Sequence, residues 1–239
     1  VSYPDAGSPQ GGVVSPALSN VFLHYVLDLW FEQQVKPCLK HRAFVIRFAD
    51  DFVIGFRDDR DAQRVMEVLP KRFGKYGLTV HPTKTKLVPF RPPSSKTKER
   101  NKAPGDRPGT FYFLGFTHYW ARSLRGYWVV KLKTASDRFS RAVRSMDSWC
   151  RIYRHLPIKE QQQKLNEKLR GHYAYYGVTG NGTALSRFLH EVERRWRKWL
   201  RRRNRLRSLT WSVFCRLLQH YPLAPVRTVH SAYRHAANP

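Results

Sequence analysis

The segment 44–56 constrains the fold most, because two strongly apolar runs flank an adjacent pair of carboxylates. Aromatic and β-branched residues dominate 44–48 and 52–56, a composition typical of buried strands. Only a short stretch containing Asp50 and Asp51 separates these runs, which predicts a β-hairpin with two negative charges at its turn. Asp is also an ordinary turn residue, since its side chain hydrogen-bonds its own backbone. The pair alone therefore fits a structural turn and a metal-binding turn equally well.

The charge of the chain limits the kinds of molecule that it is expected to bind. Its 239 residues include 44 Lys and Arg against 17 Asp and Glu, a formal net charge of +27. This excess predicts a polyanionic partner, and nucleic acid fits it best. An acidic membrane surface is the competing partner, but no stretch approaches the roughly 18 uninterrupted apolar residues of a membrane-spanning helix. Three widely spaced cysteines predict neither a zinc site nor a disulfide framework.

The apolar pattern predicts an α+β chain in two parts. The expected elements are a helix over 15–36, the hairpin over 44–56, a helix over 58–77 that Pro70 kinks or breaks, short strands over 78–80, 86–90, 111–116 and 127–133, and helices over 134–154, 158–176, 184–203 and 208–219. The Pro- and Lys-rich segment 91–109 is expected to be a basic mobile loop. Residues 1–132 then carry helices on an antiparallel sheet, and 133–239 form an all-α domain.

Further motifs accompany the carboxylate pair in a defined order along the chain. They are Gly7-Ser8-Pro9-Gln10-Gly11-Gly12, Ser15-Pro16, Phe48-Ala49-Asp50-Asp51, Gly77-Leu78-Thr79-Val80 with Lys84-Thr85, and Phe113-Leu114-Gly115-Phe116. This order and spacing resemble the palm of reverse transcriptases, specifically the family encoded by group II introns of bacteria and organelles. The segments 169–176 and 211–223 resemble the thumb, or maturase, domain of that family. The resemblance covers nearly the whole chain.

The resemblance implies a two-metal site for phosphoryl transfer. Asp50 and Asp51 match the acidic pair that binds Mg²⁺ and performs catalysis, and Asp50 is the safer ligand. The implied nucleotide-binding residues are Gln10, Gly11, Phe48, Ala49 and Lys84, and the implied primer grip is Phe113, Leu114 and Gly115. Phe48 stands where the family usually has Tyr, so a hydroxyl is missing there.

The sequence departs from this family at its beginning. The family has a further metal-binding Asp on a strand upstream of the Pro-Gln-Gly-Gly loop, with the fingers before it. Asp5 does not match that position, because it lies only two residues before the loop at Gly7. The third carboxylate is therefore expected upstream of this chain, and the chain alone is expected to be inactive.

The expected helix over 184–203 is a candidate for binding RNA. Its apolar residues, Trp196 and Trp199 among them, recur at helical spacing and predict a buried stripe. Nine Lys and Arg lie between 194 and 207 without an acid, an arrangement that a phosphate backbone would neutralise, although a solvated face has the same composition. RNA contact is predicted for Arg194, Arg195, Arg197, Lys198, Arg201, Arg202, Arg203 and Arg205.

The resemblance also implies the partners and the place of action. The intact protein would be an RNA-directed DNA polymerase that takes an RNA template, a DNA primer and dNTPs. It would bind its group II intron RNA and assist splicing, in the bacterial cytoplasm or with the nucleoid. Two alternatives remain: a non-catalytic RNA-binding splicing cofactor or relic, and a related retroelement or CRISPR-associated reverse transcriptase.

Overall fold

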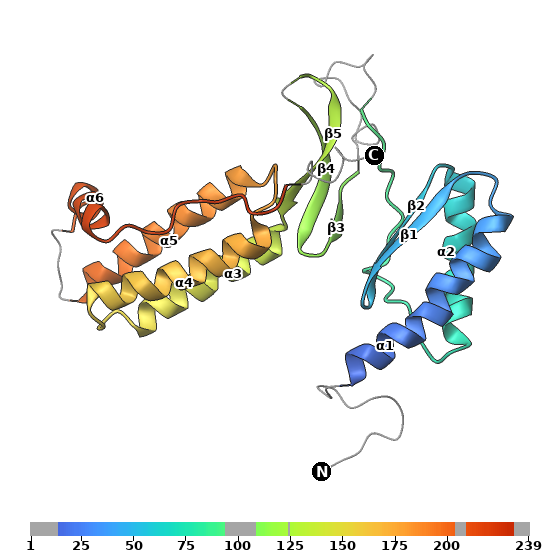
Figure 1. Cartoon of the computed structure of the whole chain (residues 1–239), viewed down its shortest axis with the longest axis horizontal. Coiled ribbons are helices and arrows are strands. Elements are labelled where there is room, and N and C mark those ends of the chain that lie inside the picture. Colours follow the sequence, from blue (N-terminus) through green and yellow to red (C-terminus); the bar gives the residue numbers. More distant parts are fainter. Residues whose placement is uncertain (1–13, 94–108, 124, 204–208, 232–239) are drawn as a thin grey trace, which may run out of the picture. The chain divides into compact units, whose positions relative to one another are not determined.

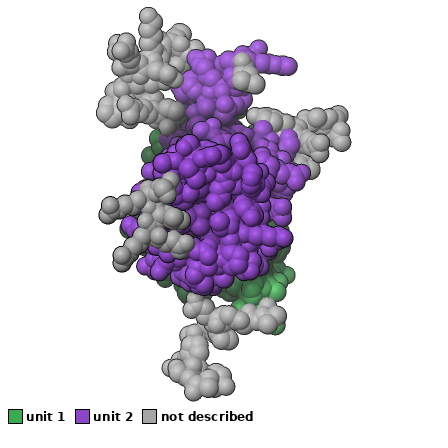
Figure 2. Space-filling model, turned by 90° about the vertical axis from the view of Figure 1, so that its left-hand side faces the viewer, with its two compact units in different colours: residues 1–89 green, residues 90–239 purple. Residues whose placement is uncertain are grey.

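The computed structural model describes residues 14–93, 109–123, 125–203 and 209–231. The chain divides into two compact units, Val1–Pro89 and Phe90–Pro239, which Figure 2 colours separately. The palm–thumb boundary predicted near residue 132 falls inside the second unit and stays a prediction about domains. The mixture of small antiparallel sheets and helices confirms the α+β class. Among the described residues, no helix combines the length and apolarity that crossing a membrane requires.

The first unit packs helices against one face of a two-stranded hairpin (Figure 1). Its elements are α1 (Ser15–Leu23), the π-helical turns η1 (His24–Leu29) and η2 (Phe31–Val35), the 3₁₀ turn η3 (Lys36–Cys38), β1 (Ala43–Phe48), β2 (Asp51–Phe56) and α2 (Asp59–Gly74). The core contains Leu27 and Phe31 from the first helical segment and Leu69 and Phe73 from α2. The antiparallel pairing of β1 with β2 confirms the predicted hairpin, with Phe48 opposite Asp51.

Helix α2 begins as predicted and continues past its proline. The Asp58 carboxylate accepts hydrogen bonds from the backbone N–H groups of Arg60 and Asp61, which satisfies the first turn. Of the two outcomes predicted at Pro70, the break is wrong, since the helix runs unbroken to Gly74, and the kink stays a prediction. Burial of Leu69 and Phe73 on either side contributes about 1.5–3 kcal/mol each, which offsets a proline cost of about 3 kcal/mol.

Two predicted strands are absent from the described part of the chain. Segments 78–80 and 86–90 run without strand pairing. Leu78 and Val80 are apolar because they pack on the core of the first unit after the turn at Gly77, not because they pair with a strand. Phe90 packs against the rings of Phe111 and Trp120. The first helical segment also runs further than expected, through Pro37 in η3.

The second unit joins a three-stranded antiparallel sheet to a helical bundle. Its elements are β3 (Phe111–Phe113), β4 (Phe116–Arg122), β5 (Trp128–Thr134), α3 (Ser136–Ile152), α4 (Ile158–Tyr176), α5 (Gly182–Arg203) and α6 (Trp211–His220). The expected single strand over 111–116 is instead a hairpin, because Leu114 and Gly115 adopt positive φ and turn the chain. The four predicted helices are confirmed to within a few residues at their ends.

The bundle buries the tryptophans of α5, as the helical spacing predicts. Trp196 is fully buried and Trp199 is 9% exposed. The Trp196 Nε1–H donates to Gln161 Oε1 at 2.9 Å, and the amide of Gln161 donates to the carbonyls of Arg154 and Leu156. This buried network satisfies two carbonyls of the connection between α3 and α4 and fixes α4 against α5.

Candidate active site

The predicted catalytic pair occupies a tight, exposed turn. Residues 49 and 50 form a two-residue turn, and Asp51 begins β2 opposite Phe48. Ala49 has a φ of 54°, a conformation that costs a residue with a Cβ about 1–2 kcal/mol. Both carboxylates are exposed, and neither makes an ion pair or hydrogen bond with another described residue. The turn therefore presents hard oxygen ligands that no side chain of the described protein neutralises.

Arg47 holds this turn against the first helical segment. Its Nη1–H donates to the carbonyl of Ala49 at 3.0 Å and to Asn20 Oδ1 at 2.9 Å. Its Nε–H and Nη2–H donate to the two carboxylate oxygens of Asp28 at 2.9 and 2.7 Å. The Arg47 guanidinium thus links the end of β1 to the turn and to the first helical segment. Arg47 therefore positions the candidate metal ligands. Sequence reasoning assigned no role to Arg47, Asp28 or Asn20.

The pair between Arg47 and Asp28 predicts a measurable change in local stability. Arg47→Gln should destabilise the hairpin by about 1.5–3 kcal/mol, because Asp28 loses charge-assisted hydrogen bonds in a half-buried place. Hydrogen exchange of the amides in 43–56 measures it. Lys36→Gln is the matched control, since it removes an exposed pair with Glu32 that is worth about 0–1 kcal/mol. Equal effects from both variants would contradict the positioning role.

The same pair gives the pH dependence a sign. The hydrogen bond from Arg47 is the main cause that holds the pKa of Asp28 below its ordinary value of 3.8, in spite of partial burial. The unfolded chain therefore takes up the proton first as pH falls. The unchanged chain should be more stable than the Arg47→Gln variant by the full amount above pH 3.8. This difference in stability should shrink as the pH drops through the folded-state pKa of Asp28.

The implied nucleotide-binding residues do not form one described pocket. Phe48 is 64% exposed beside the aspartate turn, on the face of the hairpin that the helices leave open. Lys84 is exposed in a turn over 82–84, and no hydrogen bond or ion pair links it to Asp50 among the described residues. Gln10 and Gly11 lie outside the described residues.

The implied primer grip forms the turn of the β3–β4 hairpin in the second unit. Leu114 (φ 48°) and Gly115 (φ 75°) make a two-residue turn with positive φ at both positions, which strains Leu114. The Tyr175 hydroxyl of α4 donates to the carbonyl of Leu114 at 3.1 Å, and its ring stacks on Phe116. A Cβ at position 115 would lie 3.2 Å from the Tyr176 hydroxyl, which favours glycine there.

The basic residues of α5 are less available than their sequence indicates. Arg194 pairs with Glu191 at 3.1 Å, and Arg195 pairs with both Glu191 at 3.2 Å and Asp147 at 3.6 Å. Lys198 Nζ lies 3.1 Å from Asp147. The run 194–207 contains no acid, but acids from α3 and from the preceding turn of α5 neutralise part of it.

Two further arginines of α5 serve the bundle. The Arg197 Nε–H donates to the carbonyl of Leu209 at 3.1 Å, and its guanidinium lies over the Trp211 ring. Arg203 donates to the carbonyl of Leu156 at 3.0 Å. These contacts satisfy carbonyls of neighbouring segments, so both side chains have a structural role whatever else they bind.

The remaining predicted RNA contacts divide into three cases. Arg202 lies over the Trp199 ring, 4.9 Å from its centroid. Arg201 is exposed and has no polar partner among the described residues. Arg205 lies outside the described residues.

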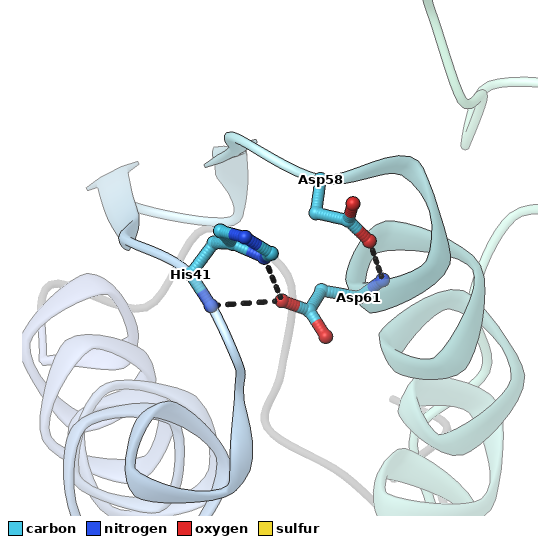
Figure 3. A group of neighbouring side chains, drawn as sticks. All are labelled: His41, Asp58 and Asp61. Carbon is cyan, nitrogen blue, oxygen red and sulfur yellow. Dashed lines mark hydrogen bonds and ion pairs between the residues drawn. The ribbon is translucent and has the colours of Figure 1, made fainter.

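A group with metal-ligand chemistry, His41, Asp58 and Asp61, lies at the start of α2 (Figure 3). The backbone N–H of His41 donates to Asp61 Oδ2 at 3.2 Å, and the ring Nδ1 lies 3.8 Å from the same oxygen. Backbone hydrogen bonds from Asp61 and Arg60 lower the pKa of Asp58, which caps the helix. These carboxylates already serve backbone donors at the positive end of a helix, a poor place for a cation. We interpret the group as a structural contact between the segment before β1 and the start of α2. It does not include Asp50 or Asp51.

The first unit also leaves large apolar side chains exposed. On β1, the side chains of Phe44, Ile46 and Phe48 are 55%, 52% and 64% exposed and share one face. The first helical segment adds an exposed row at helical spacing, consisting of Leu18, Val21, Phe22 and Tyr25. Exposed apolar surface of this extent marks a contact face.

A comparison with protein families agrees with the order of motifs that resembles reverse transcriptases. Residues 1–118 match the family model of the reverse transcriptase (RNA-dependent DNA polymerase). No curated protein matches the chain. The match includes the whole first unit and the β3–β4 turn. Over residues 1–118 the chain is therefore similar to reverse transcriptases.

Proposed function

We propose that this chain is the C-terminal part of the palm, followed by the thumb, of a group II intron reverse transcriptase that also assists splicing. The aspartate turn carries this proposal, because two exposed carboxylates, without polar partners among the described residues, end a hairpin inside the matched region. The intact protein would extend a DNA primer on an RNA template with dNTPs.

The carboxylates of the turn suit Mg²⁺, which prefers hard oxygen ligands and keeps several waters. Asp50 is the primary ligand in this proposal. Asp51 begins β2 directly after Asp50, and it would be the secondary ligand. When bound, the metal would activate the primer 3′-oxygen and stabilise the departing pyrophosphate. Arg47 contributes by fixing the carbonyl of Ala49 and hence the direction of the turn.

The exposed apolar face of the first unit supports a catalytic centre that further polypeptide completes. Phe44, Ile46 and Phe48 are the size of residues that normally enter a core, and Phe48 lies opposite Asp51 at the turn. A segment that covers this face would lie beside the turn and could supply the third carboxylate that the family uses. The isolated chain is then inactive because its metal site is incomplete.

The second activity in the proposal is binding of the intron RNA. The net charge of +27 supports a polyanionic partner, and exposed Arg and Lys on helices suit recognition of RNA shape and backbone. A non-catalytic splicing cofactor shares these features, so the RNA partner and the polymerase activity need separate tests.

A comparison of the affinities for two RNAs tests the assignment of a group II intron RNA as partner. The chain should bind a folded group II intron RNA about tenfold or more tightly than an unrelated structured RNA of equal length, a difference of about 1.4 kcal/mol or more. Filter binding at one salt concentration measures both affinities. Equal affinities would contradict a dedicated intron partner and favour the alternative of a related retroelement enzyme.

A further inference from the structure

Helix α3 carries arginines on the side away from the bundle core. Its buried residues include Val143, Met146 and Cys150. Three exposed arginines lie on the opposite side, and we refer to them as the α3 arginine face: Arg141, Arg144 and Arg151. At about 100° per residue, these three positions fall within about 80° of one another around the helix axis. They extend over about 15 Å along it.

The α3 arginine face lacks acidic partners in the part of the chain that the structure describes. None of its three side chains makes a hydrogen bond or ion pair with another described residue. Asp147 lies on the same helix but faces α5, where it accepts from Lys198 Nζ at 3.1 Å and from Trp199 Nε1–H at 2.9 Å. Burial disfavours the charge on Asp147, but these hydrogen bonds outweigh burial and hold its pKa below its ordinary value.

The α3 arginine face is unlike the basic run of α5. The two helices lie side by side (Figure 1), and the acid at their contact, Asp147, pairs with Arg195 and Lys198 of α5. Arg141 and Arg144 are instead three residues apart with no acid between them, a spacing at which like charges repel and lower helix stability. This arrangement lowers the stability of α3 and leaves guanidinium N–H donors without partners among the described residues. We therefore expect an anionic molecule to bind here.

We propose that the α3 arginine face, and not the run on α5, supplies the main phosphate contacts of this chain with structured RNA. This inference rests on the proposed RNA-binding function and assigns it to a surface. Each guanidinium offers paired N–H donors that match phosphate oxygens. The hydroxyl of Ser148, which is exposed on the same stretch of helix, adds a further donor. On α5, Arg194, Arg195 and Lys198 would first have to give up Glu191 or Asp147. Arg197 and Arg203 would have to give up backbone carbonyls.

Two variants with equal charge change test the assignment. The first replaces Arg141, Arg144 and Arg151 with Gln; the second replaces Arg194, Arg195 and Lys198 with Gln. Both remove three positive charges, so long-range attraction falls equally. The probe is a fluorescein-labelled RNA hairpin, followed by anisotropy at several salt concentrations.

Loss of three phosphate contacts should lower the magnitude of the salt slope by about two to three in the first variant. The ratio of Kd values at 200 and 50 mM salt should therefore become about 20–40-fold smaller. The second variant should change the salt slope by less than the loss of one phosphate contact would. Thermal unfolding adds a second readout: the first variant should be as stable as the unchanged chain or more so, and the second less stable.

The outcomes separate this inference from the proposed function. Equal slope reductions in both variants, or a larger one in the second, would overturn the assignment to α3 while RNA binding stands. Failure of the unchanged chain to bind the hairpin would overturn both. A first variant that loses binding to phosphatidylserine vesicles but keeps its RNA slope would show that the surface serves a membrane.

Discussion

Raising salt from 50 to 200 mM should lower the affinity of the chain for structured RNA by about 10³–10⁵. Each neutralised phosphate releases counterions, so log K falls with log salt in proportion to the number of contacts. A chain with a net charge of +27 should make about six to ten such contacts. Filter binding or anisotropy over several salt concentrations measures the slope.

The salt experiment needs a check on the RNA itself. A hairpin that stays folded over the whole salt range, as shown by its melting curve, excludes a change in RNA structure as the cause. A flat salt response would contradict phosphate binding by this chain and leave its positive charge as an ordinary solvated surface.

The second large effect concerns the aspartate turn. In the protein extended by its upstream coding sequence, Asp50→Asn should reduce primer extension by about 10³-fold, since a lost metal ligand removes several kcal/mol of transition-state stabilisation. Affinity for RNA should not change, because Asp50 lies in a different compact unit from the basic helices. Primer extension and anisotropy on the same preparations measure the two properties.

Two further variants calibrate the effect of Asp50→Asn. Asp137→Asn removes an exposed carboxylate at the start of α3 and should leave extension intact. Asp51→Asn should reduce extension less than Asp50→Asn, because Asp51 is the secondary ligand in this account. A larger loss from Asp51→Asn than from Asp50→Asn would contradict the assignment of ligands.

The elements that sequence predicted well are those whose signals are local. The 44–56 hairpin follows from two apolar runs and a short turn, and the start of α2 follows from the cap at Asp58. The buried tryptophans of α5 follow from helical spacing. Each pattern is complete within a few residues, so tertiary contacts reinforce it instead of deciding it.

The misread elements depend on contacts between distant residues. Leu78 and Val80 have strand composition, yet they pack on a core instead of pairing with a strand. The run 111–116 reads as one strand, but Leu114 accepts a strained turn that Tyr175, 61 residues later, holds by a hydrogen bond. Neither outcome has a local signal.

The candidate site shows the same division. Asp50 and Asp51 were found from their neighbours in sequence. The pairing of Arg47 with Asp28, 19 residues away, has no spacing rule. Asp147 neutralises Lys198 across 51 residues, so counting charges along 194–207 overstated how many were unpaired. A charge run identifies a basic surface only after the tertiary partners of each residue are known.

Primer extension on an RNA template with Mg²⁺ tests the central claim most directly. It compares the upstream-extended protein, its Asp50→Asn variant and the isolated 239-residue chain. The account predicts DNA synthesis by the extended protein, almost none by its variant and none by the isolated chain. An inactive extended protein would contradict the polymerase assignment, and robust synthesis by the isolated chain would contradict the incomplete metal site.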